Sequence, residues 1–247
     1  MISVCIATHN GEKFIKEQLD SILCQLAPED EVVISDDGST DKTLYIIAEY
    51  NDPRLKVLHF NQPSKTRYTH LYVTRNFENA LKHTQGDIIF LSDQDDKWMP
   101  DKVKKCVAAI SNMGLVVHNL RIVNDNMEDS GENLYKNGFV RFRNYFLRVG
   151  KYYGCSLAFR REMMDVIMPF PSKLVLHDYW IGILAEHFGG AVYIDEPLIY
   201  YRVRDASISH GAAYPIIYKI WYRVYILCHL YCRLLSVHLY NWISSLK

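Results

Sequence analysis

The chain has 247 residues, of which 49% are hydrophobic and 23% charged, and its basic and acidic residues balance to a net charge of zero. This size allows one large domain, or one domain with an appendage, around a substantial core. A neutral net charge gives no sign of the basic face that nucleic-acid-binding domains carry, so we expect no nucleic-acid partner. The six cysteines form no Cys-x-x-Cys pair, which is typical of buried thiols in a reducing cytosol. The N-terminal apolar run is too short for a signal peptide, which also favours a cytoplasmic location.

Strand and helix patterns alternate through the first half of the chain. Apolar, β-branched runs predict strands, and apolar residues at helical spacing predict helices. The predicted strands are 2–7, 31–35, 55–60, 87–91 and 115–118, and the predicted helices are 12–26, 43–50, 77–83 and 100–113. Residues 61–70 are expected to form a loop. This alternation indicates an α/β fold with a Rossmann-like, mostly parallel central sheet and helices on both faces.

The second half is less regular. Residues 120–150 have no clear period and are expected to supply binding contacts. A strand is predicted at 155–159, a helix at 177–188 and one or two short strands at 192–201. We therefore divide the chain into a domain of residues 1–205 and a helical tail of residues 206–247.

The tail has a distinct composition. It contains no Asp or Glu and is rich in Trp, Tyr, Leu and Ile. Five polar residues fall on one face of a helical projection, and these are Lys219, Arg223, Arg233, Asn241 and Ser244. The pattern predicts an amphipathic helix on an anionic membrane surface, which would make the protein peripheral on the inner face of the cell membrane. A helix packed on its own domain or on a partner subunit is the alternative. Charged residues interrupt any stretch long enough to span a bilayer.

An acidic loop is the most informative feature of the chain. The apolar run 88–91 leads through Ser92 directly into Asp93, Asp95 and Asp96. Carboxylates this close repel one another unless a cation lies between them. Their oxygens suit Mg²⁺ or Mn²⁺ holding a phosphate-bearing substrate. A solvated loop that caps the following helix is the alternative interpretation.

Two further polar clusters follow predicted strands. Residues 8–12 (Thr-His-Asn-Gly-Glu) follow the first strand, and residues 36–39 (Asp-Asp-Gly-Ser) follow the second. In an open α/β sheet such ends converge on one crevice, which would suit a nucleotide. The chain has neither a Gly-x-Gly-x-x-Gly run after its first strand nor a Gly-Lys-Ser/Thr loop. Dinucleotide-binding and P-loop folds are therefore disfavoured.

Together these motifs resemble those of family 2 glycosyltransferases, which have the GT-A fold. The resemblance is carried, in the family's order, by residues 3–11, 33–41, 75–77, 86–98 and 177–180. The Ser-Asp-Gln-Asp-Asp run and the later His-Asp-Tyr-Trp are most similar to bacterial rhamnosyltransferase-like enzymes of surface-polysaccharide assembly. These motifs span about residues 2–202, so the resemblance covers most of the chain.

The resemblance implies a role for each matching residue. Asp178 would be the catalytic base of an inverting displacement, and Asp95 and Asp96 with Asp93 would hold Mg²⁺ or Mn²⁺. The implied nucleotide-sugar-binding residues are Thr8, His9, Asn10, Glu12, Asp36, Asp37, Arg75, Asp93 and Arg204. The alternative role of Asp178 is to cap the following helix.

Two positions depart from the family's pattern. His9 stands where the family usually has Tyr, and His can still stack on or hydrogen-bond a base. Arg204 stands where related enzymes often have a His that completes the metal site. A guanidinium is permanently protonated and cannot bind a cation, so Arg204 would contact the diphosphate instead.

The implied activity is transfer of a sugar, rhamnose by the narrower resemblance, from a nucleoside-diphosphate sugar. The acceptor would be a hydroxyl of a glycan or polyprenyl-linked glycan in bacterial O-antigen or capsule synthesis. One alternative is a nucleotide-sugar-binding protein of the same fold with reduced or lost catalysis, which Arg204 favours. The other is a sugar-phosphate nucleotidyltransferase. It would need a Gly- and Lys/Arg-rich loop where residues 8–13 have one Gly and one Lys.

Overall fold

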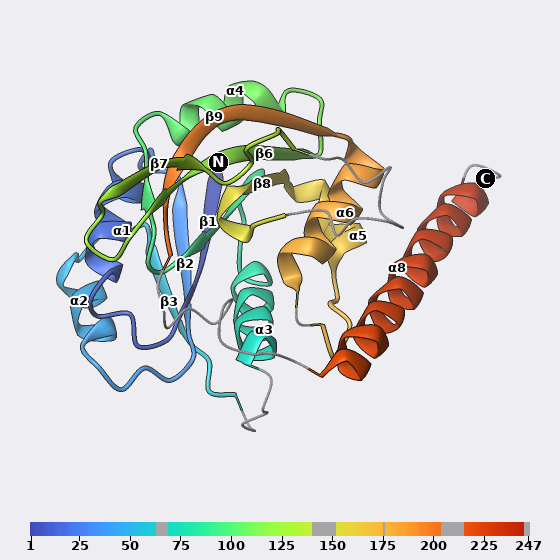
Figure 1. Ribbon diagram of the computed structural model, residues 1–247, viewed down its shortest axis with the longest axis horizontal. Helices are drawn as coiled ribbons and strands as arrows, with labels where there is room; N and C mark the ends of the chain where they lie inside the picture. The colour runs from blue at the N-terminus through green and yellow to red at the C-terminus, as the bar shows by residue number, and fades with distance from the viewer. Residues whose placement is uncertain (63–68, 140–151, 175, 204–214, 245–247) are drawn as a thin grey trace.

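The computed structural model describes residues 1–62, 69–139, 152–174, 176–203 and 215–244 (Figure 1). Within these ranges the strands are β1 (Ile2–Thr8), β2 (Glu31–Asp36), β3 (Leu55–His59), β4 (Ile88–Asp93), β5 (Lys97–Trp98), β6 (Leu115–Val123), β7 (Asp129–Asn133), β8 (Leu157–Arg160) and β9 (Ala191–Arg202). The helices are α1 (Ile15–Leu23), α2 (Thr43–Glu49), α3 (Thr69–Leu81), α4 (Lys102–Ile110), α5 (Met164–Ile167), α6 (His177–Gly189) and α8 (Ile216–Ser244). Two short 3-10 turns, η2 (Gly154–Ser156) and η3 (Arg161–Met163), flank β8.

All of these strands join one sheet in the order β3-β2-β1-β4-β8-β6-β9-β5, and β7 pairs with β6. The first four strands are parallel, because a helical crossover connects each pair of successive strands among them. Beyond β4 the sheet is mixed: β8 is antiparallel to both β4 and β6, whereas β9 is parallel to β6. The predicted α/β fold with a helix-covered sheet is confirmed, and the three predicted polar clusters follow strands of its parallel part.

Helices cover both faces of the parallel strands. The register of β1 with its neighbours places Ser92 and Ser35 on opposite faces of the sheet. Gln18 of α1 donates a hydrogen bond to Ser92, and Asn79 of α3 donates one to Ser35 at 2.9 Å. The central strands are therefore buried on both sides, and residues 4–6, 32–34 and 89–91 have no exposed surface. Strands covered on both faces have continuous apolar runs, which is why the sequence identifies them well.

Most predicted elements lie within two residues of their observed ends, but several differ. Helix α3 begins at Thr69 rather than 77. The sequence did not indicate its first turns, because they contain β-branched and polar residues of low helix propensity. The predicted strand 155–159 begins with the η2 turn, and its strand part is β8. The region 192–201 is a single strand whose register shifts near Pro197. The predicted irregular region 120–150 contains the end of β6 and the whole of β7, and its part from 140 onward lies outside the described residues. Of the predicted loop 61–70, residues 63–68 also lie outside the described residues.

Helix α8 packs along α6 at one edge of the molecule (Figure 1). Its inner face buries Tyr222, Ile226 and Leu230. Arg233, predicted on the polar face, instead donates from Nη1 to the carbonyls of Val166 and Met168 at 2.7 and 2.8 Å. The described structure therefore has the tail helix packed on its own domain, with Arg233 as an anchor. None of the helices in the described ranges combines the length and apolar character that a membrane-spanning segment needs.

Candidate active site

The ends of β1, β2 and β4 lie side by side, so the three predicted polar clusters meet at one edge of the sheet. Thr8 pairs in register with Asp36, and Ala7 pairs with Asp93. Gln94, which was not among the predicted site residues, ties two of these loops together. Its Oε1 accepts hydrogen bonds from Thr8 Oγ1 at 2.6 Å and from the backbone N–H of His9 at 2.9 Å. The acidic loop is thus fixed against the loop that follows β1.

The loop after β1 takes its shape from its own polar residues. Asn10 has a φ of 50°, and its Oδ1 accepts a hydrogen bond from the backbone of Thr40 at 2.8 Å. The Glu12 carboxylate accepts one from the backbone of Lys42 at 3.0 Å. Both side chains therefore brace the loop before α2, and their direct contact with a nucleotide stays a prediction.

Adjacent aspartates after β2 have different environments. Asp36 is buried and accepts hydrogen bonds from the backbone and hydroxyl of Ser39, which shapes the turn. Asp37 is partly exposed and accepts a hydrogen bond from Gln62 Nε2 at 3.0 Å. Burial nevertheless raises the pKa of Asp37. His9 Nδ1 donates to the carbonyl of Asp37 at 2.7 Å. Asp37 is thus the more accessible carboxylate for a base N–H, and His9 lies beside it.

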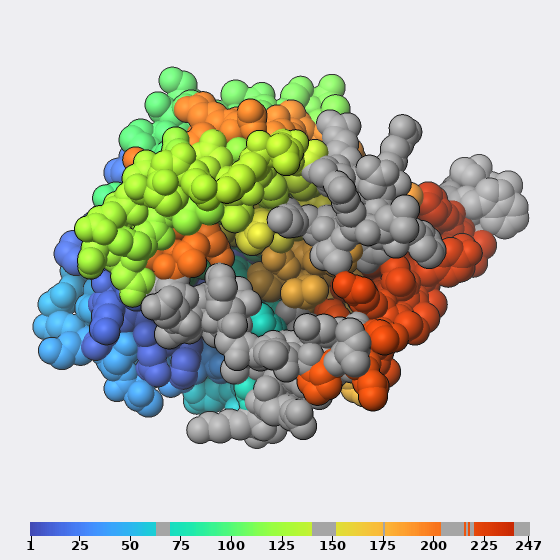
Figure 2. Space-filling view, viewed as in Figure 1, coloured from blue at the N-terminus to red at the C-terminus, as the bar shows by residue number. Residues whose placement is uncertain are grey.

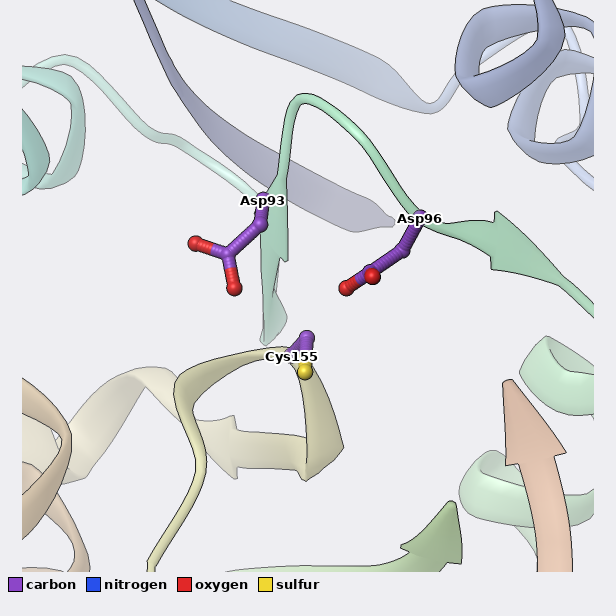
Figure 3. Close-up of side chains that lie close together, drawn as sticks. All are labelled: Asp93, Asp96 and Cys155. Atoms are coloured by element: carbon purple, nitrogen blue, oxygen red, sulfur yellow. The ribbon is translucent and has the colours of Figure 1, made fainter. Parts of the chain in front are cut away.

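The acidic loop brings two carboxylates and one thiol together. Asp93 and Asp96 point toward Cys155 of η2, and one ligand atom from each lies within 4.8 Å of the others (Figure 3). Asp96 is 1% exposed, and its Oδ1 accepts a hydrogen bond from the backbone of Arg202 at 3.0 Å. Its buried Oδ2 has no hydrogen-bond partner of ordinary geometry among the described residues. Burial, followed by the charges of Asp95 and Asp93, raises the pKa of Asp96 well above its usual value.

These properties fit a divalent cation between Asp93 and Asp96, because a cation would offset both burial and repulsion. Cys155 was not predicted, and an isolated cysteine in an apolar run gives no signal for such a place. Burial and the nearby carboxylates raise the pKa of the Cys155 thiol, so it stays neutral and is a weak ligand for hard cations. Asp95 is not one of the three converging groups, and its role as a ligand stays a prediction.

Arg202 braces the acidic loop from the end of β9. Its side chain is 2% exposed and pairs with Glu17 of α1 at 2.7 Å. Its Nε donates to the carbonyl of Asp95 at 2.7 Å, and its guanidinium lies 4.6 Å from the ring centroid of Phe14. Arg202 was not predicted, because its partners come from distant parts of the chain. The predicted Arg204 lies outside the described residues.

Asp178 lies in the first turn of α6, close to η2. Its Oδ1 accepts a hydrogen bond from the backbone of Tyr179 at 2.8 Å. The N-cap position of α6 is Leu176, so Asp178 lies inside the helix and is not its N-cap. Burial raises the pKa of Asp178 to about 6, while backbone hydrogen bonds, including one from Gly154, oppose that shift. A Cβ at Gly154 would lie 3.2 Å from His177 Nε2, so glycine allows η2 to pass close to the helix start.

Helix α3 borders the same edge of the sheet. Asn76 Nδ2 donates to the carbonyl of Thr8 at 3.1 Å, and Phe77 stacks on His177 with ring centroids 4.3 Å apart. Arg75, the residue before Asn76, is partly exposed on this helix. Its predicted contact with a diphosphate is compatible with that place and stays a prediction.

Comparison with known proteins identifies the family. A family model described as glycosyl transferase family 2 matches residues 3–168, which include the ends of β1, β2 and β4 and the η2 turn. The chain belongs to glycosyl transferase family 2. Its members carry out glycosyl transfer, so this chain is a glycosyltransferase by family.

Individual relatives agree with this assignment. The dTDP-rhamnosyl transferase RfbG of Shigella flexneri is 29% identical over 238 residues, which cover 88% of this chain and 81% of that protein. A crystal structure of S. aureus TarS 1-349 in complex with UDP-GlcNAc matches at a TM-score of 0.65 and 24% identity, covering 86% of this chain and 61% of that one. The mannosyltransferase PcManGT from Pyrobaculum calidifontis, in complex with GDP-Man and Mn²⁺, matches at 0.59 and 21% identity, covering 84% and 58%. The two solved structures show the shared GT-A fold.

Replacing Asp96 by Asn should remove a cation site from this family 2 protein without damaging its fold. Because the pKa of Asp96 is raised in the folded state, its ionised form lowers stability at neutral pH, and this cost disappears as the pH falls below that pKa. The neutral D96N variant should therefore unfold at or above the wild-type temperature at pH 7.5 without metal. Wild-type protein should gain roughly 2.7 kcal/mol of unfolding free energy when Mn²⁺ reaches about 100 times its Kd, and D96N should gain none.

The matched control is D165N, which removes an exposed carboxylate on α5. It should respond to Mn²⁺ as the wild type does. A D96N protein that keeps the wild-type Mn²⁺ response would contradict the cation site.

Proposed function

We propose that this protein transfers a sugar from a nucleoside-diphosphate sugar to an acceptor hydroxyl with inversion at the anomeric carbon. One observation carries the proposal, namely that a single turn joins a candidate base to a candidate cation site. In η2, Cys155 contacts Asp93 and Asp96, while the adjacent Gly154 contacts Asp178. A transferase needs both groups near the same sugar, one for the attacking hydroxyl and one for the leaving diphosphate.

The loops after β1 and β2 favour a pyrimidine nucleotide. Asp37 offers a partly exposed carboxylate, and His9 lies beside it with a ring that can stack on a base. Uracil and thymine each present an N–H that a carboxylate can accept. RfbG is named for a dTDP-linked sugar and TarS is bound to UDP-GlcNAc, both of which carry such a base. The extent of the match to RfbG supports dTDP-rhamnose as the donor.

Asp93 and Asp96 would hold Mg²⁺ or Mn²⁺, with Asp95 nearby. A bound cation supplies charge stabilisation to the departing nucleoside diphosphate. Two arginines, Arg75 and Arg204, would add positive charge to the same group. The Mn²⁺ bound with GDP-Man in PcManGT supports a divalent cation in this fold.

Asp178 is suited to act as the base. With a pKa of about 6 it is ionised at neutral pH and still basic enough to accept a proton in the transition state. The acceptor hydroxyl would give its proton to Asp178 as its oxygen bonds to the anomeric carbon. The bond from that carbon to the diphosphate breaks at the same time, and its electron pair leaves with the diphosphate. Attack from the opposite side inverts the configuration.

The decisive experiment measures nucleoside diphosphate release from dTDP-rhamnose, UDP-GlcNAc, UDP-Glc and GDP-Man, with Mn²⁺ and polyprenyl-linked glycan acceptors. We expect acceptor-dependent release from a pyrimidine-linked donor. The D178N variant should lose about 10²–10⁴-fold in kcat, the usual contribution of a general base, while it still binds donor. D165N is the control and should turn over normally.

Other outcomes would redirect the assignment. Donor binding without turnover by the wild type would identify a nucleotide-sugar-binding protein with lost catalysis. Pyrophosphate release from a sugar phosphate and a nucleoside triphosphate would identify a nucleotidyltransferase. A D178N protein with wild-type turnover would exclude Asp178 as the base.

The pH profile gives an independent test of Asp178. Because the base must be ionised to accept a proton, kcat/KM should be constant at neutral pH and fall as the pH drops through about 6. Below that value the decrease should approach tenfold per pH unit. Folding of the sample at each pH is checked by circular dichroism. A flat profile down to pH 5 in folded protein would contradict the assignment.

We also propose that the outer face of α8 lies on an anionic membrane surface, where a polyprenyl-linked acceptor would be found. Opposite the buried face, the helix exposes a continuous apolar stripe. The stripe consists of Ile217, Ile220, Val224, Tyr231, Leu235 and Leu239, each at least 53% exposed. Residues 206–247 contain no acid that would repel lipid phosphates. Figures 1 and 2 place this helix at one edge of the molecule, where a flat surface can reach it.

Sedimentation with phosphatidylglycerol vesicles tests the membrane proposal. The wild type should bind at low salt, and a V224E/L235E variant should bind at least tenfold more weakly, because two charges would enter the apolar layer. The control variant, Y45E/V107E, changes exposed apolar residues elsewhere and should bind normally. Equal binding by both variants would contradict the proposal. A dimer that only V224E/L235E abolishes, with no vesicle binding, would assign the stripe to a second copy of the chain.

A further inference from the structure

Lys102 is a buried cation that the mechanism above does not use. Its side chain has no exposed surface. Its Nζ donates to the backbone carbonyl of Cys155 at 2.8 Å and lies 4.1 Å from the ring centroid of Trp98. No carboxylate of the described residues lies within ion-pair distance of Nζ. A buried ammonium without a paired carboxylate is costly to fold.

The place of Lys102 in its helix increases that cost. It is the first residue of α4, where the partial positive charge of the helix N-terminus repels a cation. Burial lowers the pKa of Lys102 to about 8, and the carboxylates of Asp96 and Asp93 are among the charges that oppose this shift. Lys102 is therefore still charged at neutral pH. Methionine would fill a similar volume without a charge, so packing alone does not require lysine here.

The hydrogen bond to Cys155 connects Lys102 to both halves of the site. The Cys155 thiol lies against Asp93 and Asp96, and the preceding residue, Gly154, contacts Asp178. Through the carbonyl of Cys155, a side chain from α4 thus holds the η2 turn. Asp93 and Asp96 themselves lie on the β4 loop, which Gln94 and Arg202 fix separately.

We propose that Lys102 is a positioning residue of the transferase site, which holds the η2 turn through the Cys155 carbonyl and supplies a positive charge near Asp93 and Asp96. The inference rests on the proposed function and adds a residue to it. The hydrogen bond would keep Asp178 in line with the acceptor hydroxyl. The charge would partly neutralise the two carboxylates, which limits both their mutual repulsion and their affinity for a cation.

This dual role has a signature that a structural lysine would not give. In K102M the missing positive charge should strengthen Mn²⁺ binding. Its removal relieves twice as much electrostatic repulsion for a bound dication as for a proton that competes for the same carboxylates. The displaced η2 turn should meanwhile lower turnover, since small displacements of a catalytic group are costly in rate. Removal of an unpaired buried charge should not lower the unfolding temperature. A lysine needed only for folding would instead weaken binding, turnover and stability together.

The experiment compares wild type, K102M and K104M, in which Lys104 is an exposed lysine on the same helix. Mn²⁺ affinity is measured at pH 7 by the paramagnetic resonance signal of free Mn²⁺, alongside thermal unfolding, kcat and the donor KM. For K102M we expect a Mn²⁺ Kd at least threefold lower, a kcat at least tenfold lower and a donor KM within threefold of wild type. K104M should match wild type throughout.

Two results would overturn the proposal. One is a K102M protein whose Mn²⁺ affinity and kcat both equal those of wild type. The other is a K102M protein whose Mn²⁺ affinity and unfolding temperature both fall. If the wild type transfers no sugar, the proposed function fails, and the Mn²⁺ comparison still decides whether Lys102 acts on the acidic pair.

Discussion

The crowding of carboxylates at the end of β4 is the constraint on which the rest of the site depends. Asp96 is buried beside Asp93 and Asp95, so its ionised form is opposed by both desolvation and repulsion. Two surrounding residues hold this arrangement in place. Gln94 ties the loop to β1, and Arg202 ties it to α1 and to the end of β9. A site held this way would need little rearrangement to accept the cation proposed above.

The η2 turn connects this electrostatic constraint to the candidate base. It enters the sheet just before β8, whose antiparallel pairing with β4 places the turn beside the acidic loop. On its other side it approaches the start of α6, where Asp178 accepts backbone hydrogen bonds from Tyr179 and from Gly154 of the turn. The mixed part of the sheet therefore has a specific use. It brings a segment from the second half of the chain against the parallel half, where the polar clusters after β1, β2 and β4 lie.

The sequence predicted the parts of this arrangement that depend on local pattern. The central strands were found because strands buried on both faces have continuous apolar runs. Asp93 and Asp96 were singled out because acids directly after an apolar strand stand out in the sequence, and Asp178 was singled out by the family resemblance. Their roles stay predictions. Cys155, Lys102 and Arg202 were not found, because each owes its place to contacts more than fifty residues away. The start of α3 was missed because tertiary packing outweighs its weak helix propensity.

The η2 turn also limits how this region can change in evolution. A Cβ at Gly154 would press on His177, the Cys155 side chain must fit beside two carboxylates, and the Cys155 carbonyl accepts a hydrogen bond from a buried ammonium. Ser156 adds a fourth condition, since its hydroxyl donates to the carbonyl of Tyr153 at 2.8 Å. These demands come from different elements but fall on three consecutive residues. A substitution at one position disturbs partners that belong to the others, so the segment should be inherited as a block and not drift residue by residue.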